Sequence, residues 1–77
     1  MKNWLMLTLV GKDRPGIVAE VSRVLFDMKG NLGEASMTRL GGNFTIMLMA
    51  SIPEKINAVE EKLQPVCDKL GLFFHLD

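Results

Sequence analysis

The residues best suited to bind a small charged molecule gather at one turn, Gly11-Lys12-Asp13-Arg14-Pro15-Gly16. We expect a helix to begin there, so that the backbone N–H groups of Gly16 and Ile17 are free to donate to a carboxylate. Because glycine has no Cβ, a ligand could approach this backbone closely. Asp13 could bind an ammonium group, and Asn31 offers both a donor and an acceptor. Together these groups would suit a zwitterion.

The same residues also have a purely structural interpretation. Asp13 or Arg14 would cap the helix, and Pro15 would sit in its first turn. Asn31 would simply follow Gly30, which we expect to end the helix in the left-handed conformation. The turn and Asn31 also need not lie at the same end of one chain, so a joint site could require a neighbouring subunit. The residues alone leave both interpretations open.

Catalytic chemistry fits the sequence poorly. The single histidine, His75, falls in the last predicted strand, away from any loop nucleophile. Cys67 lies beside the apolar stripe of a predicted helix, where we expect a small buried or half-buried thiol. A phosphate-binding loop needs Ser or Thr after its lysine, and here Asp13 follows Lys12. We therefore expect no enzyme, no cofactor and no metal site.

Composition narrows the class of protein further. The chain has 77 residues, which predicts one domain over residues 1–77, and 48% of them are hydrophobic. Nine basic residues balance nine acidic ones, so no basic face for nucleic acid is expected. No apolar run is long enough to cross a bilayer, and the N-terminus lacks a signal cleavage site. A lone cysteine excludes an internal disulfide, and we expect a cytoplasmic protein with reduced thiols.

The spacing of apolar residues predicts the order β-α-β-β-α-β. The first helix carries a core stripe with a period of 3.6 residues, made of Ile17, Val21, Val24, Leu25 and Met28. The second helix starts around Pro53-Glu54, carries Ile56, Val59, Leu63, Val66 and Leu70, and ends at Gly71, with a kink or restart at Pro65. Strands are expected over Asn3–Val10, Asn31–Leu40, Asn43–Ser51 and Leu72–Leu76.

Right-handed crossovers then favour one topology. They predict an α+β, ferredoxin-like sandwich: a four-stranded antiparallel sheet in the order 4-1-3-2, with both helices on one face. Gly41-Gly42 is expected to form the tight turn of the central hairpin. That turn pairs Leu40 with Asn43, Arg39 with Phe44, Met37 with Ile46 and Ala35 with Leu48.

The face of the sheet away from the helices should be apolar and rich in methionine. Its predicted members are Trp4, Met6, Met47, Met49 and Phe73. Such a contiguous surface is larger than a small monomer usually exposes, and methionines suit an adaptable contact. We therefore predict that another sheet or domain covers it, in a homo-oligomer or a two-module arrangement.

Residues Leu7 to Ser51 resemble the ACT domain. The resemblance rests on the motif G-x-D-R-P-G-I-V at residues 11–18, on Gly30-Asn31-Leu32, and on Gly-Gly-x-Phe at residues 41–44. Within ACT proteins the segment looks most like the glycine cleavage system transcriptional repressor family. Two departures stand out. Gly11 occupies the position of a histidine in serine-sensing relatives, and the chain holds one such domain where the repressors usually hold two.

The resemblance implies a regulatory module that senses a small amino acid, forms a dimer and acts through a protein partner. The implied ligand-binding residues are Asp13, Arg14, Pro15, Gly16, Ile17 and Asn31. A structural dimerisation domain without a ligand is one alternative. A second is an acylphosphatase-like hydrolase, for which Arg14 and Asn31 would serve but which the adjacent Asp13 opposes.

Overall fold

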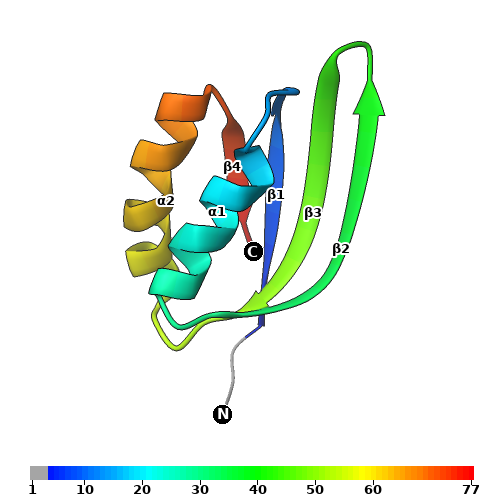
Figure 1. Ribbon diagram of the computed structural model, residues 1–77. Coiled ribbons are helices and arrows are strands. Elements are labelled where there is room, and N and C mark those ends of the chain that lie inside the picture. The colour runs from blue at the N-terminus through cyan, green and yellow to red at the C-terminus, as the bar shows by residue number, and fades with distance from the viewer. Residues whose placement is uncertain (1–3) are drawn as a thin grey trace.

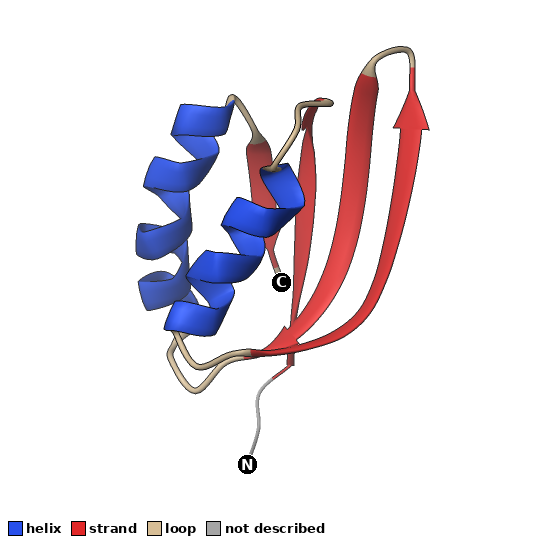
Figure 2. Cartoon of the chain, in the orientation of Figure 1, coloured by secondary structure: helices blue, strands red, loops and turns tan. Residues whose placement is uncertain are grey.

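The chain folds into a sheet with one face covered by two helices. The computed structural model describes residues 4–77. Along the chain, the elements are β1 (Trp4–Lys12), α1 (Ile17–Asp27), β2 (Asn31–Leu40), β3 (Asn43–Ser51), α2 (Ile56–Leu70) and β4 (Phe73–Leu76) (Figure 1). The strands are antiparallel and ordered β2-β3-β1-β4, and both helices lie on the same side (Figure 2). The predicted ferredoxin-like fold and strand order are confirmed.

The hydrophobic core lies between the sheet and the helices, because alternate residues of the central strands point the same way. Leu5, Leu7 and Leu9 of β1 are all buried. From α1 the buried residues are Ile17, Val21 and Leu25, and from α2 they are Val59, Leu63 and Cys67. Cys67 is fully buried, as predicted, although it lies within the buried stripe of α2 and not beside it.

The central hairpin has the predicted register. Leu40 pairs with Asn43, Arg39 with Phe44, and Ala35 with Leu48. Both turn glycines have positive φ, 60° at Gly41 and 80° at Gly42, a conformation that glycine adopts without a steric penalty. Sequence alternation did not indicate a β-bulge farther along the pair. There, residues 33 and 34 stand between the pairs Leu32–Ala50 and Ala35–Leu48, opposite Met49 alone.

The two ends of α1 differ from the prediction. Gly16, with φ 84°, is the N-cap residue, and so neither Asp13 nor Arg14 caps the helix and Pro15 precedes its first turn. At the other end the left-handed residue is Lys29, with φ 60°, and not Gly30. The N–H of Gly30 instead donates to the Leu25 carbonyl at 2.9 Å, which closes a Schellman motif one residue earlier than expected.

Helix α2 also corrects two expectations. It begins at Ile56 with Lys55 as its N-cap, later than Pro53-Glu54, and it continues through Pro65 without a restart. Pro65 lies on the exposed side of the helix. The predicted ending is confirmed, because Gly71 adopts a left-handed φ of 68°. Among residues 4–77, no helix is long and apolar enough to span a membrane.

Two strand boundaries shift as well. β1 continues past Val10 because Gly11 and Lys12 pair with Phe44 and Asn43 of β3. Its predicted first residue, Asn3, lies outside the described residues. β4 begins one residue late, after Leu72, whose side chain is buried in the core. The longer β1 shortens the turn before α1 and brings Asp13 level with the tip of the hairpin, where its N–H donates to the Gly42 carbonyl at 3.0 Å.

Candidate functional site

A pocket of about 690 Å³ separates the beginning of α1 from the β2–β3 hairpin. The hairpin extends past the helices in Figure 1, so no helix packs over this part of its inner face. Most of the lining residues belong to the turn before α1 and its first residues, and the others to the hairpin. They are Asp13, Arg14, Pro15, Gly16, Ile17, Val18, Ala19, Met37, Arg39 and Phe44.

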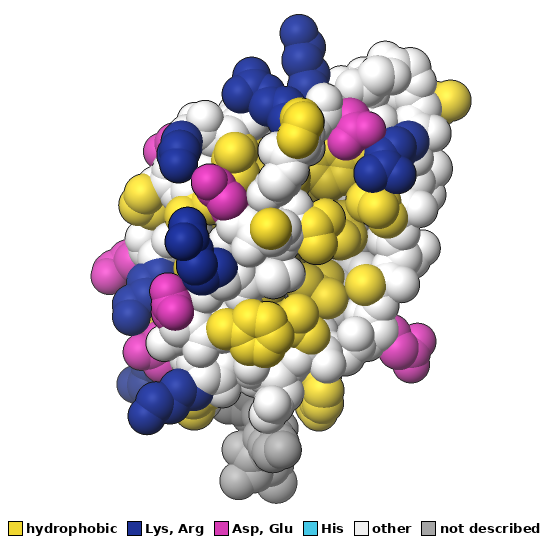
Figure 3. Space-filling view, in the orientation of Figure 1, with side chains coloured by type: hydrophobic (Ala, Val, Ile, Leu, Met, Phe, Trp, Pro, Cys, Tyr) yellow, Lys and Arg dark blue, Asp and Glu magenta, His cyan; other side chains and the backbone are white. Residues whose placement is uncertain are grey.

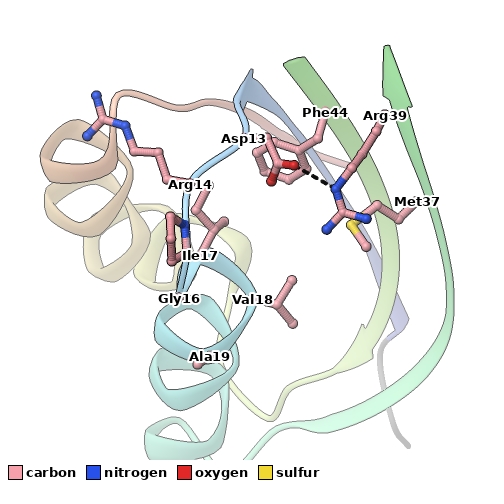
Figure 4. Close-up of a pocket in the computed structure, with 10 residues that line it drawn as sticks. Asp13, Arg14, Gly16, Ile17, Val18, Ala19, Met37, Arg39 and Phe44 are labelled. Carbon is pink, nitrogen blue, oxygen red and sulfur yellow. Dashed lines mark hydrogen bonds and ion pairs between the residues drawn. The ribbon is translucent and has the colours of Figure 1, made fainter. Parts of the chain in front are cut away.

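One ion pair spans the pocket. Nε of Arg39 lies 2.7 Å from Oδ2 of Asp13, and this contact joins β2 to the β1–α1 turn (Figure 4). The Arg39 side chain is 60% exposed and that of Asp13 38%, so the pair contributes at most about 1 kcal/mol to stability. The ion pair matters for the geometry of the site, because it holds a cation and an anion side by side at the mouth of the pocket.

The start of α1 supplies backbone donors to the same pocket. Among residues 4–77, no side chain caps this helix. The Gly16 carbonyl accepts the N–H of Glu20 at 3.0 Å, which is the first hydrogen bond of α1. The N–H groups that precede it have no carbonyl partner within the helix, and they carry the positive end of its dipole. A Cβ on Gly16 would meet no atom within 4 Å, so space is open beside this turn.

Two of the six predicted ligand-binding residues have side chains elsewhere. The Arg14 side chain runs away from the Asp13–Arg39 pair (Figure 4), and its Nη2 lies 4.0 Å from where a Cβ on Gly71 would stand. Asn31 pairs with Ser51 at the end of the sheet opposite to Asp13. Since Arg14 and Asn31 do not meet within one chain, the geometry does not favour the acylphosphatase-like alternative.

The hairpin contributes pocket residues that no sequence motif indicated. Met37, Arg39 and Phe44 line the pocket, yet none was considered as a site residue. A usable signal was present in the register, because Arg39 pairs with Phe44, which pairs in turn with Gly11 beside the turn. The register alone does not predict that the helices leave this end of the hairpin uncovered.

Apolar side chains are exposed on both faces of the molecule. On the helical face, hydrophobic atoms gather between α1 and the hairpin (Figure 3). Val18 and Phe26 of α1 and Met37 of β2 are exposed. On the opposite face, Trp4 is 51%, Met47 44% and Phe73 79% exposed. Between them, Met6 and Met49 are half-buried and line a smaller hollow of about 190 Å³.

The chain is thus a β-α-β-β-α-β sandwich with a pocket at the turn into its first helix. The ACT domain family model matches residues 3–77, and the chain belongs to that family. ACT domains are regulatory ligand-binding modules that are found in amino-acid-sensing proteins and commonly dimerise. The resemblance predicted from the sequence is thereby confirmed.

Individual relatives agree with this assignment. A UPF0237 protein of Listeria innocua is 39% identical over 74 residues, which are 92% of this chain and 83% of that protein. The solved ACT domain protein from Streptococcus pneumoniae superposes with a TM-score of 0.83 at 29% identity, over 96% of this chain and 86% of that one. A candidate glycine cleavage system transcriptional repressor has a TM-score of 0.89 at 29% identity, over all of this chain and 46% of that one.

Proposed function

We propose that residues 1–77 form one regulatory module that binds a small amino acid in the pocket at the β1–α1 turn. The observation that carries the proposal is the Asp13–Arg39 pair at 2.7 Å, which presents both charges beside the uncapped start of α1. The carboxylate of an amino acid finds donors on Arg39 and on the first turn of the helix. Its ammonium group finds the second carboxylate oxygen of Asp13.

We further propose that the working unit is a dimer that adds Asn31 to this site. β2 and β4 are the edges of the sheet, and β2 is the long one, with ten residues against four. An exposed edge of that length is a template for pairing with another chain. Antiparallel pairing of two β2 strands would bring the first residues of β2 in a second copy, Asn31 among them, alongside the Leu40 end of the first, where Arg39 lies. The apolar face of the sheet would then remain free to pack against another sheet or domain.

We propose that the signal passes through a protein partner, as the resemblance to the glycine cleavage system repressors implies. Two observations support this route. The chain has equal numbers of acidic and basic residues, so it offers no net attraction for nucleic acid. Its structure is similar to half of a candidate repressor of that kind.

A thermal-shift screen against the common amino acids tests the proposal. A ligand at a hundred times its Kd should stabilise the protein by about 2.7 kcal/mol. Asp13→Asn should abolish the shift, whereas Glu60→Gln, an equivalent charge loss on the exposed side of α2, should preserve it. A flat response across the panel would contradict amino-acid sensing and would favour the ligand-free dimerisation domain.

A further inference from the structure

Beyond its charge pair, the pocket is walled by apolar side chains. Val18 from α1 and Met37 from β2 stand on opposite sides of it (Figure 4), and they are 47% and 43% exposed. Phe44 forms part of the floor and is buried. Exposed apolar walls that face each other gain free energy when an apolar group fills the space between them.

Arg39 is held in a position from which it can bind a ligand. Its Nε is engaged by Asp13, while the terminal nitrogens of the guanidinium lie on the side of Met37 and Val18 (Figure 4). A guanidinium has five N–H donors in a fixed plane, so most remain available for a carboxylate. Asp13 thus fixes the direction of Arg39 in addition to offering an oxygen of its own.

Among residues 4–77, the lining of the pocket holds no further charge for a ligand's side chain. Its charged members are Asp13, Arg39 and Arg14, and the side chain of Arg14 runs away from the other two. The ligand's own carboxylate and ammonium groups occupy Arg39 and Asp13, so an acidic or basic side chain placed between Val18 and Met37 would lose water with no opposite charge left to pair with. The pocket therefore opposes a second charge on the ligand and favours a hydrocarbon or thioether.

We infer that this pocket selects amino acids with apolar side chains, that Arg39 binds their carboxylate, and that the walls formed by Val18 and Met37 determine the selection. This inference rests on the proposed function, because it specifies the ligand class of the same site. The charge pair binds the groups common to every amino acid, and the walls formed by Val18 and Met37 distinguish one side chain from another.

Calorimetric titration of the full chain with glycine, alanine, valine, leucine, methionine, glutamate and lysine tests the inference. Affinity should rise by about fourfold for each methylene that the walls cover, and glutamate and lysine should bind more weakly than leucine. Arg39→Ala should weaken leucine binding by about 10- to 100-fold, and Arg39→Lys should restore part of it. Arg23→Ala, which removes an exposed arginine of α1 outside the pocket, is the matched control and should have no effect.

A second variant separates the walls from the charge pair. Met37→Gln keeps the length of the side chain and makes it polar, so it should reduce the preference for leucine over glycine while glycine affinity stays constant. Glycine binding as tightly as leucine, or full affinity in Arg39→Ala, would overturn this inference and leave an amino-acid site in place. Absence of binding by every amino acid would instead overturn the proposed function.

Discussion

The indole ring of Trp4 lies against the backbone of Gly33, two strands away across the sheet. A Cβ added to Gly33 would stand 2.8 Å from Cζ3 of Trp4 and 3.3 Å from Cβ of Met49. Gly33 belongs to the bulge of β2. On the apolar face of the sheet, the Trp4 ring packs against the backbone of the bulge. A residue with a Cβ at position 33 would prevent this close approach, so glycine is required there.

Gly33→Ala should displace this ring. Because Trp4 is the chain's single tryptophan, its fluorescence emission should shift to longer wavelength as the ring enters water. The loss of stability should stay below about 1 kcal/mol, since the ring is already half-exposed and free to move. Gly41→Ala, at the hairpin tip where a Cβ meets no atom within 4 Å, should leave the emission unchanged. Unaltered emission in Gly33→Ala would contradict the contact.

Gly30→Ala should be costly for a different reason. A Cβ at this position would stand 2.9 Å from the Leu25 carbonyl oxygen, which is backbone and cannot swing away. We expect a loss of about 1–3 kcal/mol in urea unfolding. Lys29→Gly should instead stabilise the chain by up to about 1 kcal/mol, because it relieves a left-handed φ of 60°. An unchanged free energy of unfolding in Gly30→Ala would contradict this prediction and would show that the backbone at the end of α1 shifts readily.

Met47→Glu should weaken self-association without unfolding the chain. Met47 is 44% exposed on the open face, so a carboxylate there is hydrated in the monomer and desolvated in any interface that covers it. Sedimentation velocity of the variant and of Met37→Glu, whose side chain lies on the helical face, compares the two surfaces directly. An unchanged oligomer in Met47→Glu would show that the open face is free.

Stability should fall in alkaline solution through Cys67. Burial raises the pKa of its thiol from 9.0 to about 11, and the charge of Asp68 acts in the same direction. The unfolded chain therefore loses this proton first, so the stabilisation is complete below about pH 9 and is lost as pH rises toward 11. The loss is on the order of 2–3 kcal/mol. Cys67→Ala should remove this part of the pH dependence, and equal curves for both proteins would contradict it.

The topology could be predicted because it depends on patterns that the sequence states directly. Alternation in β1 and β3 fixes which side chains face the helices, and Gly41-Gly42 fixes the hairpin register. Helix ends are harder to predict, because neighbouring residues compete for them. At the end of α1, Lys29 adopts the left-handed conformation. Gly30 is needed at the next position, because a Cβ there would clash with the Leu25 carbonyl oxygen.

The candidate site was only half predictable. Its turn, from Asp13 to Ile17, is a local motif with recognisable residue types. Arg39 is 26 positions away from Asp13, and they become neighbours because β2 pairs with β3 and β3 pairs with β1. Asn31 lies at the opposite end of the sheet, an arrangement that the sequence left open, so its place in the site depends on a second copy of the chain.

The most direct test of the account is an NMR titration of the ¹⁵N-labelled protein with leucine. Binding at the α1 turn predicts that the largest shifts occur at the amides of Gly16 and Ile17 and at Nε–H of Arg39, with little change at the Gly71 amide. No shifts at these three groups, or leucine-dependent shifts centred on another part of the chain, would contradict it.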